Sequence, residues 1–250
     1  MYALYVIYVL YRMYVLYGMY IHYIHYAPVP LSLMEFKPMI LLIAYEKGGT
    51  GKSTLAKNLA VYLQQQGRDL VTIDTDPQET LYRWCDRRKD QADAKPITCV
   101  KLTGSKILPD LRSLSEKYAD VIIDAGGADS PALRSAMAIA THLLVPMQPN
   151  AGDIEILGHM ADLIEKAHVY NPNMKVRSVL TMCPTLPSRY SLILDAKDVC
   201  VDYGLKPLNA YTSRREIYDV ISMSGLSVLE SDNAKAKQEI IDIAQEILGA

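Results

Sequence analysis

The stretch Lys47-Gly48-Gly49-Thr50-Gly51-Lys52-Ser53-Thr54 decides the fold of this chain. It follows an apolar run, residues 39–44, that predicts a buried strand. It precedes apolar residues at positions 55, 56, 59, 60 and 63, which is the spacing of a helix. A strand, a glycine-rich turn and a helix start are the context that a phosphate-binding loop requires. The glycines let backbone amides curl around an anion, and the helix N-terminus adds unpaired donors.

Two side chains of this stretch have predicted roles in binding a nucleotide. Lys52 is expected to reach the β- and γ-phosphates, and the Ser53 hydroxyl is expected to bind Mg²⁺. The general phosphate-loop pattern begins with a glycine where this chain has Glu46, and a second lysine, Lys47, follows instead. A glycine-rich turn with a chance Gly-Lys-Ser is the alternative interpretation, and the flanking strand and helix argue against it.

The rest of the body alternates between predicted strands and helices. Further strands are predicted at residues 70–74, 97–102, 119–124, 142–147, 174–182 and 207–211. Helical apolar spacing lies between most of them and again near the C-terminus. This alternation predicts an α/β fold with a mostly parallel, twisted sheet and helices on both faces, in a single domain over residues 39–250. In such sheets ligands bind at the carboxyl ends of the strands.

Carboxylates follow two of these predicted strands. Asp74 and Asp76 lie in Asp74-Thr75-Asp76-Pro77-Gln78, in which Pro77 suits the first turn of the next helix. Asp124 ends the apolar run Val121-Ile122-Ile123 and precedes two glycines, an arrangement that can hold Mg²⁺ directly or through water. Taken alone, each segment can also be a solvated strand end that caps a helix.

Together these motifs resemble the ParA/MinD family of deviant Walker A ATPases, which are P-loop NTPases. Residues 47–54 resemble the deviant Walker A motif with its early lysine, and residues 74–78 resemble Walker A′. Residues 121–127 resemble Walker B. Residues 145–150, with Asp153, resemble the stretch that follows the fifth strand in this family. A strand that ends at a proline and is followed by a helix cap explains residues 145–150 equally well. The C-terminal segments 212–218 and 227–230 are also similar, and small ParA/ParF-like plasmid partition proteins are the closest group. Tyr45 departs from the asparagine of many relatives.

The resemblance implies an ATP-dependent switch with ATP and Mg²⁺ as cofactors. Lys47, Lys52 and Asp76 are the expected catalytic residues: Asp76 orients the attacking water, and Lys47 crosses to the phosphates of a second copy in an ATP-bound homodimer. Ser53, Asp74 and Asp124 are the expected metal-site residues, Asp74 acting through water. The dimer is expected to bind nucleoid DNA without sequence preference, in DNA partition, and a ParB-like centromere-binding partner releases it by stimulating hydrolysis.

Composition limits where partners can bind. The net charge is −2, so DNA contacts need a local basic patch, for which Arg189, Arg214 and Arg215 are the candidates. The four cysteines are scattered without metal-ligand spacing, and a reducing, cytoplasmic, nucleoid-associated location in a bacterium is expected. No membrane contact is expected, because the C-terminal amphipathic pattern is acidic. A MinD-like membrane-cycling or cargo-positioning ATPase, and a nucleotide-binding scaffold with little turnover, stay open as alternatives.

The first 38 residues differ in composition from the body. Tyrosine recurs at every third position from Tyr2 to Tyr26, which matches neither a strand nor a helix period. We expect this low-complexity leader, residues 1–38, to be a translated tandem repeat upstream of the true start, with Met34 and Met39 as candidate starts. A membrane element is the alternative on grounds of length, although tyrosine prefers the membrane interface to its centre.

Overall fold

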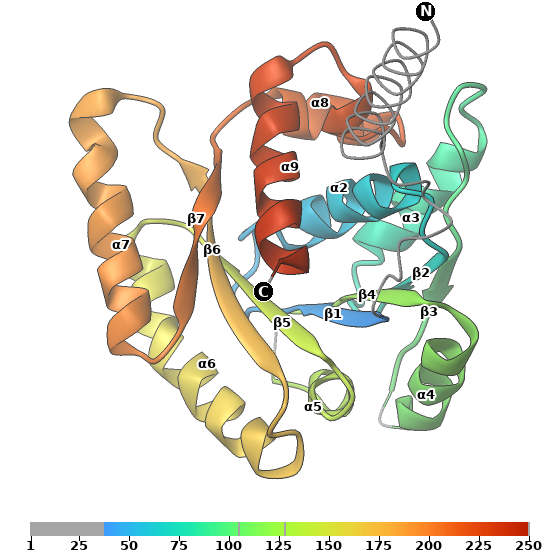
Figure 1. Cartoon of the computed structure of the whole chain (residues 1–250), viewed down its shortest axis with the longest axis horizontal. Coiled ribbons are helices and arrows are strands. Elements are labelled where there is room, and N and C mark those ends of the chain that lie inside the picture. The colour runs from blue at the N-terminus through green and yellow to red at the C-terminus, as the bar shows by residue number, and fades with distance from the viewer. Residues whose placement is uncertain (1–37, 105, 128, 250) are drawn as a thin grey trace, which may run out of the picture. The chain divides into compact units, whose positions relative to one another are not determined.

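The computed structural model describes residues 38–104, 106–127 and 129–249, so all of the expected leader except Pro38 lies outside the described residues. The body forms one compact unit. Seven parallel strands form a single sheet in the order β3-β2-β4-β1-β5-β6-β7 (Figure 1). The strands are β1 (Met39–Ile43), β2 (Leu70–Asp74), β3 (Cys99–Lys101), β4 (Asp120–Asp124), β5 (His142–Met147), β6 (Lys175–Cys183) and β7 (Lys206–Ser213). The predicted α/β fold class is thereby confirmed.

Helices cover both faces of the sheet, as predicted (Figure 1). The helices are α2 (Lys52–Gln65), α3 (Thr80–Lys89), α4 (Leu108–Lys117), α5 (Pro131–Met137), α6 (Ala151–Tyr170), α7 (Tyr190–Asp202), α8 (Ile217–Met223) and α9 (Ala234–Leu248), with short 3₁₀ turns at Pro187–Arg189 and Val228–Glu230. One core lies under α2, α3, α8 and α9 and the other under α4, α5, α6 and α7. Each helix therefore buries one apolar stripe against a buried sheet.

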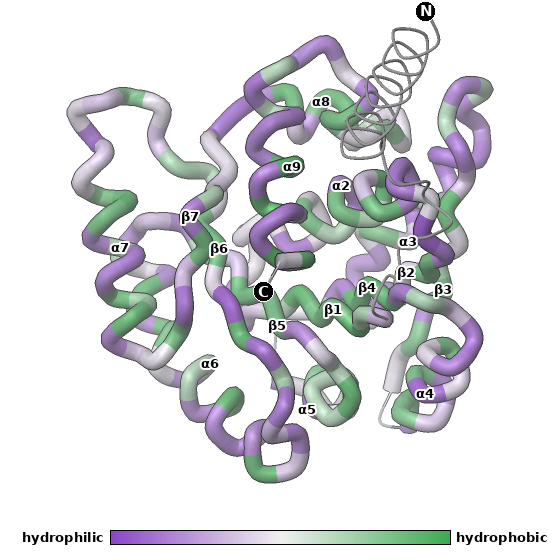
Figure 2. Tube along the Cα trace, in the orientation of Figure 1, coloured by the Kyte–Doolittle hydropathy of each residue, from purple (hydrophilic) through white to green (hydrophobic). Residues whose placement is uncertain are grey.

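The inner strands are apolar along both faces because both faces are covered. Leu41 and Ile43 of β1 point into one core, while Leu42 between them points into the other. Figure 2 shows these inner strands as hydrophobic segments between helices of mixed character. Burial on both sides fixes the strand register, and the register brings the strand ends of the expected site together.

The carboxyl ends of β1, β2 and β4 meet at one edge of the sheet. Asp124 pairs in register with Ile43 on one side and with Asp74 on the other. The loop at residues 44–51 leaves β1 at that same level. Because β4 and β5 flank β1 on opposite sides, the strand order reverses here, which is where open α/β sheets bind ligands.

Two local expectations need correction. Pro77 lies in a turn before α3, which begins at Thr80, because Glu79 adopts a left-handed conformation (φ 52°) that a helix cannot include. Strand β7 is longer than predicted and its pairing with β6 is irregular between Ser178 and Cys183. Glu246 of α9 accepts hydrogen bonds from Asn209 N at 2.8 Å and Ala210 N at 2.6 Å. Two backbone donors of this edge strand are therefore satisfied by a side chain.

Within the described ranges, every helix is too short or too polar to cross a membrane.

Candidate functional site

The loop between β1 and α2 has the geometry of an anion cradle. Gly49 and Gly51 have φ values of 74° and 85°, which non-glycine residues adopt only with strain. Gly51 stands at the N-terminus of α2, and its carbonyl accepts the first helical bond from Leu55 N at 2.9 Å. The first amides of a 14-residue helix therefore face the loop without helical partners.

Two polar side chains from neighbouring strands brace this loop. Thr181 of β6 donates its hydroxyl to the carbonyl of Thr50 at 2.9 Å. Gln148, which follows β5, donates its amide to the carbonyl of Gly49 at 2.9 Å. With two carbonyls bound away from the cavity, the loop presents its N–H groups to a ligand, as a phosphate cradle must.

Lys52 is folded across the loop. Its Nζ donates to the carbonyl of Lys47 at 2.8 Å. Burial lowers the pKa of Lys52, while the carboxylates of Asp124, Asp76 and Asp153 oppose that shift. The side chain is 6 % exposed, and a buried ammonium of this kind is stabilised by an anionic ligand.

The two carboxylates after β2 are held differently. Asp74 is buried, and its two oxygens accept backbone bonds from Asp76 N at 3.0 Å and Tyr82 N at 2.9 Å. Burial nevertheless raises the pKa of Asp74. Asp76 is half-buried and lines the cavity, with one oxygen bound to Gln78 N at 2.9 Å. Asp76 is thus the carboxylate that can reach a ligand, and Asp74 supports the turn that carries it.

Asp124 is a buried carboxylate without a hydrogen-bond partner in the described part of the chain. Both of its oxygens are buried and unpaired. Burial raises the pKa of Asp124 to about 7; the nearby Ser53 hydroxyl and Lys52 oppose this, whereas Asp74 and Asp76 add to it. A buried orphan carboxylate beside a serine hydroxyl is a donor set that suits Mg²⁺, so the residues fit the expected metal.

Lys47 is held by α6 of its own chain. Its Nζ lies 2.7 Å from Oδ1 of Asp153, which is fully buried in the first turn of α6. Asn150 caps the same helix by accepting from Asp153 N at 3.0 Å, and Gln148 N donates to the second Asp153 oxygen at 2.6 Å. The sequence could assign Asp153 as a helix cap or as a family-like position. The structure adds its ion pair with Lys47.

Tyr45 also contacts α6. Its hydroxyl donates to the backbone carbonyl of Asp153, and burial raises the pKa of Tyr45 strongly, with Asp153 and Glu46 adding to that shift. The neighbouring Glu46 pairs with His159 of α6. The residues that depart from the expected pattern, Tyr45 and Glu46, therefore attach the start of the loop to this helix.

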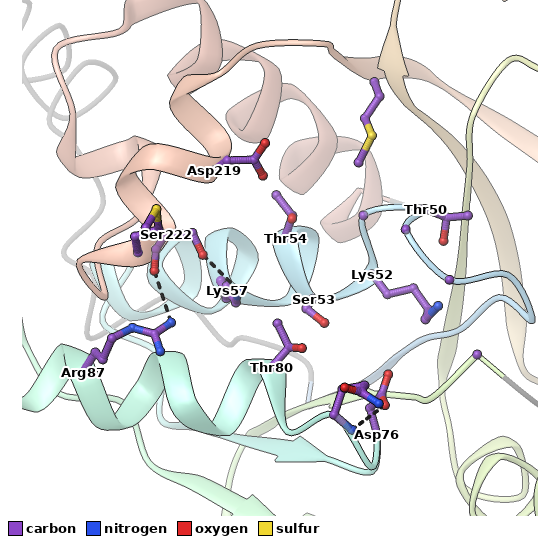
Figure 3. A pocket seen from close by; sticks show the side chains of 17 residues that line it. Thr50, Lys52, Ser53, Thr54, Lys57, Asp76, Thr80, Arg87, Asp219 and Ser222 are labelled. Atoms are coloured by element: carbon purple, nitrogen blue, oxygen red, sulfur yellow. Dashed lines mark hydrogen bonds between the residues drawn. The ribbon is translucent and has the colours of Figure 1, made fainter.

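The loop opens into a cavity of about 570 Å³ whose far side the sequence did not predict (Figure 3). Lys57, Arg87 and Ser222 lie at one end of it, away from Lys52 and Asp76. A smaller cavity of about 80 Å³ adjoins it and shares four lining residues: Gly51, Thr54, Met182 and Asp219. Thr212 and Tyr218 also line this smaller cavity. Met182, Thr212 and the two α8 residues, Tyr218 and Asp219, come from elements far from the loop in sequence, so only the tertiary structure reveals them.

The three arginines proposed for DNA differ in their surroundings. Arg215 pairs with Glu239 of α9 at 2.9 Å. Arg214 is exposed and donates to the Gln148 side chain at 3.3 Å. Arg189 is exposed and forms no ion pair with the residues that the structure describes. The structure thus leaves Arg189 and Arg214 accessible to an anion and places Arg215 in a structural pair.

A family model supports the assignment of the chain. The model described as CobQ/CobB/MinD/ParA nucleotide binding domain matches residues 41–238. The maintenance of carboxysome distribution protein A of Halothiobacillus neapolitanus is 26% identical over 215 residues, which cover 85% of this chain and 97% of that protein. The chromosome partitioning protein ParA of Caulobacter vibrioides is 26% identical over 253 residues, covering 84% of this chain and 93% of that protein.

Solved structures share the fold. The ATP complex of a McdA variant from Cyanothece has a TM-score of 0.69 at 17% identity and covers 85% of this chain and 97% of that one. Cobyrinic acid a,c-diamide synthase from Mycobacterium smegmatis with bound ADP and magnesium has a TM-score of 0.61 at 19% identity, covering 78% and 96%. The expected cofactors, ATP and Mg²⁺, agree with these complexes. The chain belongs to the CobQ/CobB/MinD/ParA nucleotide-binding domain family and is a ParA/MinD-type P-loop ATPase.

Proposed function

We propose that this chain is a positioning ATPase whose ATP-bound dimer binds nucleoid DNA without sequence preference and partitions DNA. The observation that carries the proposal is the pair of lysines on one loop: Lys52 crosses the loop, while Lys47 lies at its rim in an ion pair with Asp153. Lys52 can bind the phosphates of the nucleotide on its own chain, and Lys47 can separate from Asp153 and bind the phosphates of a second copy. The catalytic domain is residues 39–250.

The proposed nucleotide lies along the cavity, with its phosphates on the loop. Amides of residues 48–54 and the Lys52 ammonium bind the phosphates, because those donors converge there. The smaller cavity beside Gly51 and Met182 is the proposed place of the base and ribose, since it adjoins the loop and lies between the ends of β6 and β7.

Mg²⁺ supplies charge neutralisation at the phosphates when bound. Asp124 and Ser53 are the proposed ligands, and Asp74 supports them through water. Asp76 accepts a hydrogen bond from the attacking water and orients it. Asp76 lines the cavity, while the bond from Gln78 N fixes the carboxylate.

The Lys47–Asp153 pair suggests how dimerisation begins. Lys47 is 35 % exposed while Asp153 is fully buried, so the lysine is the partner that can move. The proposed step is release of Lys47 from Asp153 and its transfer to the phosphates of the second copy, where negative charge is greater. Hydrolysis by a partner-stimulated dimer then returns Lys47 to Asp153.

The proposed cargo follows from the relatives of this chain. The Caulobacter vibrioides relative, a chromosome partitioning protein, favours DNA as the cargo. A ParB-like centromere-binding protein is the partner that we propose for it. The carboxysome-distribution relative favours a second candidate, the positioning of a protein compartment. In both candidates the ATP-bound protein attaches to a large matrix, and we propose nucleoid DNA as that matrix. Arg189 and Arg214, which are exposed, are the proposed DNA contacts.

The decisive experiment is co-sedimentation of the purified protein with random duplex DNA and, separately, with anionic liposomes. The proposal expects Mg-ATP-dependent binding to DNA that weakens steeply with salt, and no binding to liposomes. Lys52→Ala is expected to lose at least about tenfold in ATP affinity, because a charge-assisted contact is removed. Nucleotide-independent DNA binding, or ATP-dependent liposome binding, would contradict the proposal.

A further inference from the structure

One end of the nucleotide cavity has two cations that no carboxylate neutralises within the described residues. Lys57 Nζ donates to the Ser222 hydroxyl at 2.9 Å, and Arg87 donates to the Ser222 carbonyl at 3.4 Å (Figure 3). Lys57 comes from α2, Arg87 from α3 and Ser222 from α8. Three separate elements therefore bring two positive charges and one hydroxyl to a single point of the cavity wall.

The burial of Lys57 makes this arrangement costly without a ligand. Lys57 is 5 % exposed, and a buried ammonium is ordinarily paired with an acid. Burial lowers the pKa of Lys57, Asp124 opposes that shift, Arg87 adds to it, and Cys85 and Asp74 oppose it. A buried ammonium beside an exposed guanidinium, neither with an ion pair to the described residues, indicates a place for an anion.

This end of the cavity is distinct from the phosphate loop. Lys57 follows Ser53 by one helical turn, so both side chains lie on the same side of α2. Figure 3 shows Lys57, Arg87 and Ser222 grouped together, with Thr80 and Ser53 between them and Lys52. Asp219, the acid on the same helix as Ser222, lies nearer Thr54.

A purely structural role accounts for only part of the geometry. Cations beside the last turn of a helix stabilise its carbonyls, and Arg87 does so at the end of α8. Lys57 donates instead to a hydroxyl, a bond that a neutral side chain could also make. Its charge is therefore unexplained by the fold.

We propose that Lys57, Arg87 and the Ser222 hydroxyl bind a phosphate group at a second subsite, separate from the loop at residues 47–54. Two sources fit this chemistry: free orthophosphate, which ATP hydrolysis releases in the same cavity, and a second phosphate carried on a nucleotide. The first source rests on the proposed function, in which ATP is hydrolysed in this cavity, and the second does not.

The test uses the full chain and the fluorescence of Trp84, the only tryptophan, which lies three residues before Arg87 in α3. Orthophosphate is titrated at constant ionic strength into protein saturated with Mg-ADP, so that the loop is already occupied. A saturable response is expected, weakened about tenfold or more in Lys57→Met and in Arg87→Gln. Lys89→Gln is the matched control, because Lys89 is an exposed cation of the same helix that pairs with Asp86 at 3.0 Å.

A second titration identifies the source. Adenosine 3′,5′-bisphosphate is compared with AMP, and a gain in affinity that depends on Lys57 assigns the subsite to a nucleotide-borne phosphate. Mg-ADP affinity and the melting temperature of each variant report whether the loop and the fold survive. If Lys57→Met binds both probes as the unaltered protein does, the subsite does not exist. If Mg-ADP itself fails to bind, the proposed function and its nucleotide position fail, and the orthophosphate titration of nucleotide-free protein still tests the subsite.

Discussion

At the scale of single residues, the chemistry of this ATPase depends on charges that the fold buries. Lys52, Lys57, Asp74 and Asp124 are all buried, and the two lysines line the nucleotide cavity. Burying each of these charges costs free energy, and a bound ligand of opposite charge would offset that cost. Asp124 shows this most clearly, because both of its oxygens are orphaned.

Asp124→Asn is expected to stabilise the protein without metal at pH 8. The carboxyl titrates at about 7 in the folded chain against an ordinary value of 3.8, so the folded state binds more protons between these values. Stability contributed by this group is present at low pH and is lost as the pH rises through about 7. The difference corresponds to roughly 4 kcal/mol at most.

Thermal unfolding with EDTA across pH 4 to 9 checks this expectation. The variant and the unaltered protein should agree near pH 4, diverge progressively between about pH 4 and pH 7, and differ by a constant amount above pH 7, the variant being more stable. Mg-ATP should reverse the order at pH 8, because only the carboxylate binds the metal strongly. If Asp124→Asn were instead less stable at pH 8 without metal, another group of the metal-free protein would have to stabilise the Asp124 carboxylate.

At the scale of elements, much of the site was predictable because it lies at strand ends that the sequence marks. The loop at 47–54 and the acids at 74, 76 and 124 are local patterns, and parallel register alone brings Asp74 beside Asp124. Lys57 and Arg87 were missed because each looks like an ordinary helix residue. Only the packing of α2, α3 and α8 brings them to Ser222.

The same packing gives a structural role to residues 227–230, which the sequence marked only as similar to short ParA proteins, and to the preceding Gly225. Arg88 of α3 is buried, donates to both oxygens of Glu230 at 2.7 and 2.9 Å, and also bonds the carbonyls of Lys95 and Gly225. A side chain at Gly225 would lie 2.6 Å from Arg88 N, so glycine is required there. This segment thus fixes α3, and with it Arg87, against α8.

Arg88→Met is expected to destabilise the protein by about 3 kcal/mol, because it leaves a largely buried Glu230 unpaired. For a domain of this size the melting temperature should fall by roughly 6–12 °C. Arg83→Met is the control on the same helix, since Arg83 is exposed and lies 3.9 Å from Glu79. Equal melting temperatures for the two variants would show that the Arg88 network contributes little.

At the scale of the whole molecule, the seven strands and two cores of the described part of the chain lie within residues 39–249. A chain of residues 39–250 is therefore expected to keep the melting temperature and Mg-ATP affinity of the full chain. Circular dichroism melts and calorimetric ATP titrations compare the two, and a truncated chain that fails to fold would assign the leader a structural role.

The change from monomer to dimer depends, in our proposal, on moving one lysine. Lys47→Ala removes the group proposed to reach the second copy but leaves Lys52, the loop amides and Asp124 in place. Mg-ATP should therefore still bind the monomer within about threefold of the normal affinity, while the ATP-dependent dimer and hydrolysis are lost. Light scattering after gel filtration measures the dimer, and phosphate release measures turnover.

Lys47→Arg distinguishes loss of charge from loss of fit. Arginine keeps the charge and can pair with Asp153, but its planar, wider head cannot follow the lysine into a site built for a compact ammonium. We expect it to remain monomeric and to bind ATP. If Lys47→Ala dimerised with ATP as well as the unaltered protein, Lys47 would act only within its own chain. The ion pair with Asp153 would then be its working position, and dimerisation would have to arise from another part of the cavity rim.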